Sequence, residues 1–230
     1  MNFDKVAVTL YDVLGYLLPG YLILLALSLG ESTFATSSFL SLSVLTTHYI
    51  PSTVAAYFAG QAAHAVASSV TESRFRKVIQ ASREKLSSEL YARMLSELEA
   101  VYGKEALPKA EKGNLEAYLL ADSYLVAAGR GADRDVLLAR EGFFKQSVVA
   151  AVALLVVLAS SLAVGGVAVQ PSPGVRTPVA WWPTMTATLL ALAVVLLFRL
   201  RFGFYHRIKM NNTFLLFLAV RVTERQAGRA

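Results

Sequence analysis

The chain has 230 residues, of which 55% are hydrophobic and 17% are charged. Soluble domains carry about a quarter of their residues as charged side chains and disordered chains are poor in apolar ones, so this composition excludes a disordered protein and argues against an ordinary soluble domain. No cysteine is present, which rules out a disulfide framework, a thiolate metal site and a cysteine nucleophile. The net charge of +6 is typical of basic residues at the cytoplasmic surface of a membrane protein. We expect no nucleic-acid partner, because the sequence has no basic-aromatic recognition motif.

Four apolar windows are long enough to cross a bilayer. About 20 residues, each adding about 1.5 Å, traverse a hydrocarbon core of about 30 Å. The windows cover residues 13–29, about 51–70, 148–169 and 179–198. They predict an all-α polytopic membrane protein with four transmembrane helices. The first window has no clear basic region or cleavage site of a signal peptide, so we expect it to be retained as a span.

The start of the second helix is open to two interpretations. Residues 39–49 are apolar but rich in Ser and Thr, and including them would make the helix too long for the bilayer unless it tilts strongly. Proline suits the first turn of a helix, so we expect the helix to start near Pro51, after an interfacial segment at 39–49. A kinked helix that starts earlier is the alternative.

Basic residues lie on one side of the four windows. Arg140 and Lys145 precede the third window and Arg199 and Arg201 follow the fourth, whereas the two short loops carry Arg176 alone. The positive-inside rule therefore predicts that both termini and residues 71–146 are cytoplasmic. The adjacent Trp181 and Trp182 mark the opposite interface, where amphipathic rings prefer to lie.

Residues 71–146 predict a cytoplasmic helical subdomain built from extensions of the second and third spans. Apolar residues recur at three-to-four spacing along its first part, at Leu86, Leu90, Met94, Leu98 and Val101. Gly103 and Pro108 break that helix, and Asn114 is a candidate cap of the next. Gly129 and Gly131 end the second helix, and a third starts at Asp133 and continues into the third span. A cytosolic protein is a candidate partner for this segment.

The tail at 201–230 mixes basic and aromatic residues. Its cationic side chains suit anionic lipid headgroups, and the candidates for that contact are Arg199, Arg201, Arg207 and Lys209. The apolar run 214–220 is too short to span a bilayer. We expect a short interfacial helix or a segment packed on the cytoplasmic subdomain, with a strand as the alternative.

Two charges lie within apolar stripes of the cytoplasmic segment. Asp122 lies among Tyr118, Leu119, Leu125 and Val126, and Arg140 precedes Phe143 and Phe144. Because an unpaired buried charge is costly, the two residues are candidates for a partly buried ion pair. The alternative is that each one snorkels or faces another subunit.

Small residues recur every four positions along the second helix. They let helix backbones approach closely where no hydrophobic effect drives association. The candidates for an intersubunit seam or a pore lining are Ala55, Ala59, Gly60, Ala63 and Ala67. Packing within one subunit is the alternative.

Gln61 and His64, polar residues at membrane depth, could line an ion path or form a hydrogen bond between helices.

Pro19 and Gly20 predict a kink or hinge in the first helix, and Gly165 and Gly166 are expected to soften the outer end of the third.

The sequence contains no phosphate-binding loop and no nucleophile–base signature. Its three histidines have no metal-ligand spacing. We therefore expect neither an enzyme nor a bound cofactor or metal ion.

The opening segment, Tyr11-Asp12-Val13-Leu14-Gly15-Tyr16-Leu17-Leu18-Pro19-Gly20, resembles the start of small bacterial membrane proteins. Four spans with a helical cytoplasmic insert also resemble membrane subunits of bacterial antiphage systems, including four-span effectors and the Kiwa membrane subunit. The resemblance implies a role in antiphage defence, with permeabilisation of the bilayer as the output. We expect a homo-oligomer in the bacterial inner membrane, whose cytoplasmic helices receive a signal from a partner and whose second-helix seam carries it into the bilayer. A scaffold that recruits a cytosolic enzyme and a small housekeeping channel or transporter are the alternatives.

Overall fold

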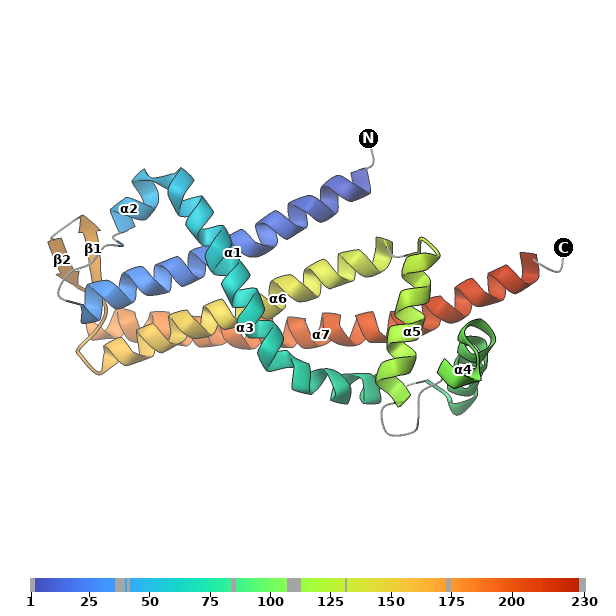
Figure 1. Cartoon of the computed structure of the whole chain (residues 1–230). Helices are drawn as coiled ribbons and strands as arrows, with labels where there is room; N and C mark the ends of the chain where they lie inside the picture. The colour runs from blue at the N-terminus through green and yellow to red at the C-terminus, as the bar shows by residue number, and fades with distance from the viewer. Residues whose placement is uncertain are drawn as a thin grey trace. The chain divides into compact units, whose positions relative to one another are not determined.

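The computed structural model describes residues 3–35, 40, 42–83, 86–106, 113–130, 132–172 and 175–227. Side chains are described for these residues except 3–14, 42–43, 71–83, 106, 113–114, 132–135, 171–172 and 176. The described chain is mostly helical, as expected (Figure 1). In chain order the elements are α1 (Phe3–Phe34), α2 (Leu42–Thr47), α3 (Tyr49–Arg83), α4 (Ser88–Tyr102), the 3-10 turn η1 (Lys104–Ala106), α5 (Gly113–Ala127), α6 (Ala132–Leu162), β1 (Ala168–Ser172), β2 (Val175–Pro178) and α7 (Trp181–Ala227).

The chain divides into two compact units. Unit 1 comprises residues 1–70 and 139–202, and unit 2 comprises residues 71–138 and 203–230. The division falls inside α3, α6 and α7, so each of these helices supplies residues to both units.

Three helices of the described chain are long and apolar enough to cross a membrane. The candidate spans are Gly15–Phe34 in α1, Val136–Leu162 in α6 and a part of α7. The expected second span, in α3, is not among them. Polar residues such as Gln61 and His64, together with the charged residues after Val70, make α3 as a whole less hydropathic than the other three helices.

Within unit 1, α1 and α3 cross in antiparallel directions. The ring of Tyr16 lies 5.7 Å from that of Tyr57, and the hydroxyls of Tyr21 and Thr53 are 2.6 Å apart. Residue numbers therefore rise along one helix as they fall along the other. Polar and aromatic side chains fix the register of this crossing.

Helix α6 runs parallel to α1 and antiparallel to α7. Gln146 of α6 contacts Gly15 of α1, and Val157 lies further along α6 beside Gly30. At one end of the α6–α7 pair the rings of Phe144 and Phe198 are 6.0 Å apart. Near the other end the Val167 amide donates to Oγ1 of Thr184 at 3.1 Å. These contacts account for the near-parallel ribbons of α1, α6 and α7 in Figure 1.

A small antiparallel hairpin, β1–β2, connects α6 to α7. Ala168 pairs with Pro178 and Val169 with Thr177. The end of α1 holds the hairpin, because Oγ of Ser32 donates to the Ala168 carbonyl and the Ala168 amide donates to Oγ1 of Thr33 at 3.0 Å. The hairpin adds two short strands to the predicted all-helical fold.

The prediction that the third span reaches Val169 is wrong. Helix α6 ends at Leu162, and Gly165 and Gly166 have positive φ angles of 92° and 131°. Such angles leave the helical region and favour glycine. A Cβ atom at Gly166 would also collide with the carbonyl of Val179. These glycines therefore end the helix rather than soften it.

Helix α3 starts close to the predicted position, near Pro51. The helix begins at Tyr49, which places Pro51 in its first turn, where proline needs no amide donor. The preceding segment forms a separate short helix, α2. Backbone hydrogen bonds from His48 to Val44 at 3.1 Å and from Ser52 to His48 at 2.9 Å join the two helices. Residues 39 and 41 of the expected interfacial segment lie outside the described residues.

Unit 2 is built around an apolar core shared by α4, α5 and the last part of α7. Ser87 caps α4 by accepting a hydrogen bond from the Leu90 amide at 3.2 Å, and Gly103 ends that helix with a φ of 82°. The buried core residues are Met94, Leu98, Ala117, Tyr118, Ala121, Leu125, Met210, Phe214, Phe217 and Leu218. Pro108, Gly131 and the side chain of Asn114 lie outside the description.

The run 214–220 is neither a strand nor a separate interfacial helix. It belongs to α7, which continues without interruption from Trp181 to Ala227. Its buried residues Phe214 and Phe217 pack against α5, where their rings meet Tyr118 and Tyr124 at 5.9 Å and 5.3 Å. The run therefore shares the apolar core of unit 2 with α4 and α5.

Candidate functional site

The crossing of α1 and α3 brings two backbones into direct contact. A Cβ atom at Gly20 would collide with the carbonyl of Ala56, and one at Gly60 would collide with the carbonyl of Tyr16. The two contacts are reciprocal, because each helix contributes one glycine and one facing carbonyl, four residues apart. Close approach of this kind needs residues without bulky side chains.

Polar side chains join α1, α3 and α6 beside this crossing. The amide of Gln146 donates to the Gly15 carbonyl at 2.6 Å, in a buried position. The ammonium of Lys145 donates to Oγ of Ser68 at 2.8 Å. The ring of His64 lies 5.7 Å from that of Tyr16. We call Tyr16, His64, Ser68, Glu141, Lys145, Gln146 and Ser147 the polar cluster.

Several atoms of the polar cluster have unused hydrogen-bonding capacity. Among the described side chains, Oε1 of Gln146, Oγ of Ser147 and Nδ1 of His64 are buried and have no hydrogen-bond partner. A buried polar atom without a partner costs about 1–3 kcal/mol.

The two polar residues expected inside the second helix have partners within the same chain. The amide of Gln61 donates to the hydroxyl of Tyr57 at 3.2 Å. His64 packs edge-on against Tyr16 and lies beside Gly142. An ion path along these residues and a hydrogen bond between helices both stay predictions, because Tyr57 lies on α3 itself and the contact of His64 with Tyr16 is one between rings.

The five seam residues do not share one environment. Gly60, Ala63 and Ala67 are buried within the chain, whereas Ala55 is exposed and Ala59 is half-buried. The buried members lie on the face of α3 that carries Ala56. An intersubunit or pore-lining role therefore stays a prediction, and the exposed face at Ala55 and Ala59 is the part of α3 available for it.

The predicted hinge coincides with the α1–α3 crossing. Helix α1 continues through Pro19, which is buried. Gly20 faces the carbonyl of Ala56, so the absence of a side chain serves the close packing described above. Bending at this point stays a prediction.

The residues of the candidate ion pair belong to different units. Asp122 lies on α5 in unit 2, and Arg140 lies on α6 in unit 1. Each takes part in an interaction within the protein. Their mutual pairing stays a prediction.

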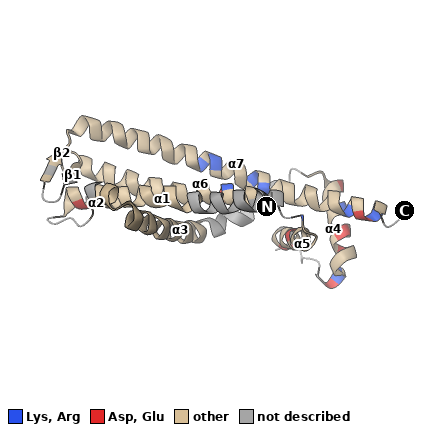
Figure 2. Cartoon of the chain, turned by 90° about the horizontal axis from the view of Figure 1, so that it is seen from above, with Lys and Arg blue, Asp and Glu red and all other residues tan. Residues whose placement is uncertain are grey.

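Three of the four residues predicted to meet lipid headgroups are exposed. Arg199, Arg201 and Arg207 are solvent-accessible and follow the charge-free first part of α7, where the blue segments begin in Figure 2. Lys209 differs, because it is only 5% exposed and lines a pocket in unit 2. Its burial makes it a poor candidate for a headgroup at the bilayer surface.

The polar residues of α6 were missed by the sequence analysis. The uncharged run of the third span starts at Val148 and is preceded by Glu141, Lys145, Gln146 and Ser147. The two charged residues among them have the pattern of a hydrophilic flank of the span. Glu141, Gln146 and Ser147 are buried in the structure. The available signal was the spacing of four between Glu141 and Lys145, which places both on one helix face.

The polar cluster connects helices and has no arrangement specific to one reaction. Among the described residues, no group of three or more His, Cys, Asp or Glu side chains could hold a metal ion. Comparison with known proteins found no matching family model, no matching curated protein and no matching solved structure.

Proposed function

We propose that the chain is a non-enzymatic, oligomeric inner-membrane protein with four spans, which couples a cytoplasmic signal or partner protein to the bilayer. Unit 1 is the membrane part in this proposal, and unit 2 is the cytoplasmic part that receives the signal. By the resemblance to antiphage membrane subunits, the setting is antiphage defence and the output is permeabilisation of the membrane.

The observation that carries this proposal is the continuity of three helices. The division between the units falls inside α3, α6 and α7, after residues 70, 138 and 202. A helix transmits displacement along its axis, because each turn is hydrogen-bonded to the next. A ligand or partner that moves the ends of these helices in unit 2 would therefore act on unit 1.

The surface of α3 supports its role as the fourth span. Large apolar side chains are exposed on this helix in a stripe that winds around it, at Ile50, Val54, Phe58, Val66 and Val70. From Ile50 to Val70 the stripe extends over about 30 Å, the thickness of the hydrocarbon core. In water such a stripe would be an unusually long exposed apolar surface, whereas lipid tails would cover it without cost.

The distribution of charge supports the proposed orientation. The hairpin end of unit 1 includes the end of α1, β1–β2 and the start of α7, with Trp181 and Trp182 exposed there. The opposite ends of α6 and α7 carry Arg140, Lys145, Arg199 and Arg201. Basic residues favour the cytoplasmic side, so both termini are cytoplasmic in this proposal.

The coupling is tested by interrupting α7 at the division between the units. Leu200 is highly exposed, so its replacement removes little packing. Leu200→Pro breaks the helix, because proline removes a backbone hydrogen bond and clashes with the preceding turn. Leu200→Ala removes the same side chain and leaves the helix intact, which makes it the matched control.

Both variants and the parent chain are expressed in bacterial cells, with uptake of an impermeant dye and membrane potential as readouts. We expect the parent and Leu200→Ala to admit dye and Leu200→Pro to admit several-fold less at equal membrane abundance. Equal dye entry with Leu200→Pro would contradict the coupling. An intact membrane with the parent chain would contradict permeabilisation and favour the scaffold.

Oligomerisation is tested on the exposed face of α3. Replacing Ala55 and Ala59 with Leu adds bulk without entering the buried face of the helix, so the protomer should fold. We expect the double variant to lose oligomers in chemical crosslinking of membranes. An unchanged crosslinking pattern would remove this face from the interface.

A further inference from the structure

The proline inside α1 leaves one backbone carbonyl of that helix without its usual donor. In an α-helix each carbonyl accepts a hydrogen bond from the N–H four residues later, and Pro19 has no N–H. The carbonyl that loses its donor is that of Gly15. Both residues are buried, and a buried acceptor without a donor is costly. The Gly15 carbonyl therefore needs a donor from outside the backbone of α1.

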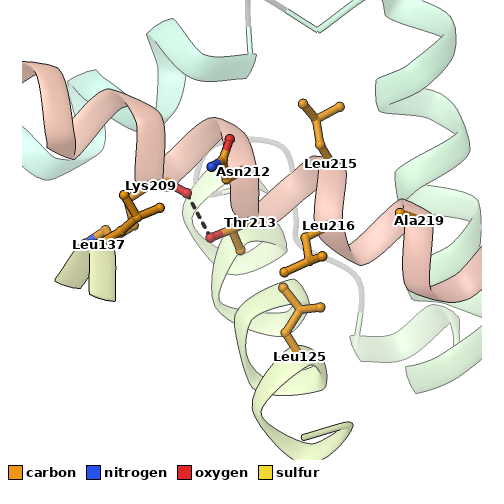
Figure 3. Close-up of a pocket in the computed structure, with 8 residues that line it drawn as sticks. All are labelled: Leu125, Leu137, Lys209, Asn212, Thr213, Leu215, Leu216 and Ala219. Atoms are coloured by element: carbon orange, nitrogen blue, oxygen red, sulfur yellow. Dashed lines mark hydrogen bonds between the residues drawn. The ribbon is translucent and has the colours of Figure 1, made fainter. Parts of the chain in front are cut away.

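The side chain of Gln146 on α6 supplies that donor. Its Nε2 lies 2.6 Å from the Gly15 carbonyl oxygen, and the residue is only 2% exposed. A side chain that binds a helical carbonyl often stays within its own helix, as Oγ1 of Thr213 does with the Lys209 carbonyl at 3.0 Å (Figure 3). Gln146 instead joins two helices, at the carbonyl that the proline has freed. Neighbouring helices commonly satisfy such carbonyls in membrane spans.

The two close contacts of α1 with α3 lie on either side of the proline. The Tyr16 carbonyl, which faces Gly60, precedes Pro19, and Gly20, which faces the Ala56 carbonyl, follows it. A bend of α1 at the proline would move Tyr16 relative to Gly20. Because both contacts are with backbone, such a bend would displace at least one of them and with it α3.

We propose that the Gln146 amide is a latch that makes the bend of α1 at Pro19 depend on the position of α6. The hydrogen bond of 2.6 Å is lost once its two atoms separate by about 1 Å more. Helix shifts of about 1–2 Å are usual in switching proteins, so a small displacement of α6 opens the latch. Helix α6 starts in unit 2, and Gln146 lies in unit 1. The latch is therefore the step by which unit 2 acts on α1, a role that rests on the proposed function.

The bend is measured with pairs of spin labels, which the cysteine-free chain permits. Pulsed electron paramagnetic resonance of the full chain in nanodiscs gives the distance between Lys5→Cys on α1 and Leu200→Cys on α7. A bend of about 20° displaces the Lys5 end sideways by about 7 Å, since about 21 Å of helix precede Pro19. The reference pair joins Leu27→Cys, after the proline, to Leu200→Cys.

Gln146→Met removes the donor and keeps the length of the side chain. We expect the distance from Lys5 to broaden or shift by several Å, while the reference distance from Leu27 stays unchanged. Ser147→Ala is the control at the neighbouring buried position, because among the described side chains the Ser147 hydroxyl has no hydrogen-bond partner. Both of its distances should match those of the parent.

The Pro19→Ala background tests the link between the latch and the proline. Alanine at this position has an N–H that can donate to the Gly15 carbonyl, so the latch becomes redundant. We expect Gln146→Met to leave the Lys5 distance unchanged in this background. An equal change in both backgrounds would overturn the link, and an unchanged distance in Gln146→Met alone would overturn the latch. If Pro19→Ala fails to fold, the comparison of Gln146→Met with Ser147→Ala decides the proposal.

Dye entry tests the role of the latch in the coupling. We expect Gln146→Met to admit several-fold less dye than the parent and Ser147→Ala at equal membrane abundance. Unchanged dye entry beside a changed Lys5 distance would overturn this role. A parent chain that admits no dye contradicts the proposed function alone, and the spin-label distances still decide whether Gln146 controls the bend.

Discussion

At the scale of single residues, two glycines determine how closely α1 and α3 approach. Gly20 and Gly60 each face a backbone carbonyl of the other helix, and a side chain at either position would overlap it. Backbone cannot move aside as the end of a flexible side chain can, so the helices would have to separate. Separation would also stretch the contact of Tyr16 with Tyr57 and His64.

Gly60→Leu should therefore destabilise unit 1. Overpacking a tight contact costs about 1–3 kcal/mol, and more where the obstacle is backbone. We expect a clearly lower midpoint of thermal unfolding for the purified protein in detergent. Ala65→Leu, at an exposed position of the same helix, is the control and should unfold near the parent midpoint. Equal midpoints for both variants would contradict the close crossing.

In unit 2, Tyr124 lies where α5 meets the end of α7. Its hydroxyl donates to the Glu224 carboxylate, and it accepts from Arg221 at 3.1 Å. Burial, together with the hydrogen bond to Glu224, raises the pKa of Tyr124 above its ordinary value of 10.0, and Arg221 opposes part of this effect. The fold thus favours the neutral phenol.

A raised pKa in the folded state means that the contribution of Tyr124 to stability is complete below pH 10 and is lost as the pH rises through the folded-state pKa. The test is an alkaline absorbance titration of the parent chain and Tyr124→Phe. The phenol missing from the variant should ionise at a higher pH than an ordinary tyrosine. Ionisation of that phenol at or below the ordinary pKa would contradict the hydrogen-bonded arrangement.

At the scale of elements, the end of α7 is attached to α4 through one buried carboxylate. Glu97 is 3% exposed, and its oxygens lie 3.1 Å from Arg225 and 3.4 Å from Arg221. A carboxylate so buried is stable only with cationic partners nearby. These ion pairs hold α4 on α7 beside the apolar core of unit 2.

Glu97→Gln should loosen α4 from α7. It removes the charge that both arginines share, with an expected loss of about 1–3 kcal/mol in the stability of unit 2. We expect faster amide hydrogen exchange throughout α4. Glu99→Gln changes an exposed carboxylate on the same helix and should leave exchange unchanged. If both variants exchange like the parent, the buried ion pairs contribute nothing to this packing.

Helix positions were predictable from the sequence where local signals were strong. Pro51 placed the start of α3, and Gly103 marked the end of α4, because both residues act through their own backbone. The length of α7 was not predictable in this way, since its basic-aromatic stretch was interpreted as an interface. Phe214 and Phe217 pack against α5, and this role becomes evident only in the folded structure.

The hairpin and the polar cluster depend on tertiary contacts and so escaped the sequence analysis. Residues 168 and 169 were predicted as the end of the third span and residues 170–172 as part of the loop after it, whereas Ser32 and Thr33 of α1 hold Ala168 in a strand. Gln146 escaped notice because its partner is 131 residues away in the sequence. No local pattern could indicate that Gln146 binds the carbonyl of Gly15.

At the scale of the whole molecule, three shared helices, α3, α6 and α7, connect unit 1 to unit 2. Unit 1 presents exposed apolar side chains on α3 and α7, as a surface in lipid would. Unit 2 has an apolar core of its own, although Leu119, Phe204 and Leu215 remain exposed. We propose that unit 1 lies in lipid and unit 2 in water. The central claim is that unit 1 crosses the bilayer four times and leaves unit 2 inside the cell.

The most direct test is cysteine mapping, because the natural chain contains no cysteine. Single substitutions are made in β2 (Val175→Cys), in η1 (Glu105→Cys) and on the exposed stripe of α3 (Phe58→Cys), and intact cells are treated with an impermeant maleimide. We predict that Val175→Cys is labelled in intact cells, Glu105→Cys only after permeabilisation, and Phe58→Cys in neither case. Labelling of Glu105→Cys in intact cells, or of Phe58→Cys from either side, would contradict the account.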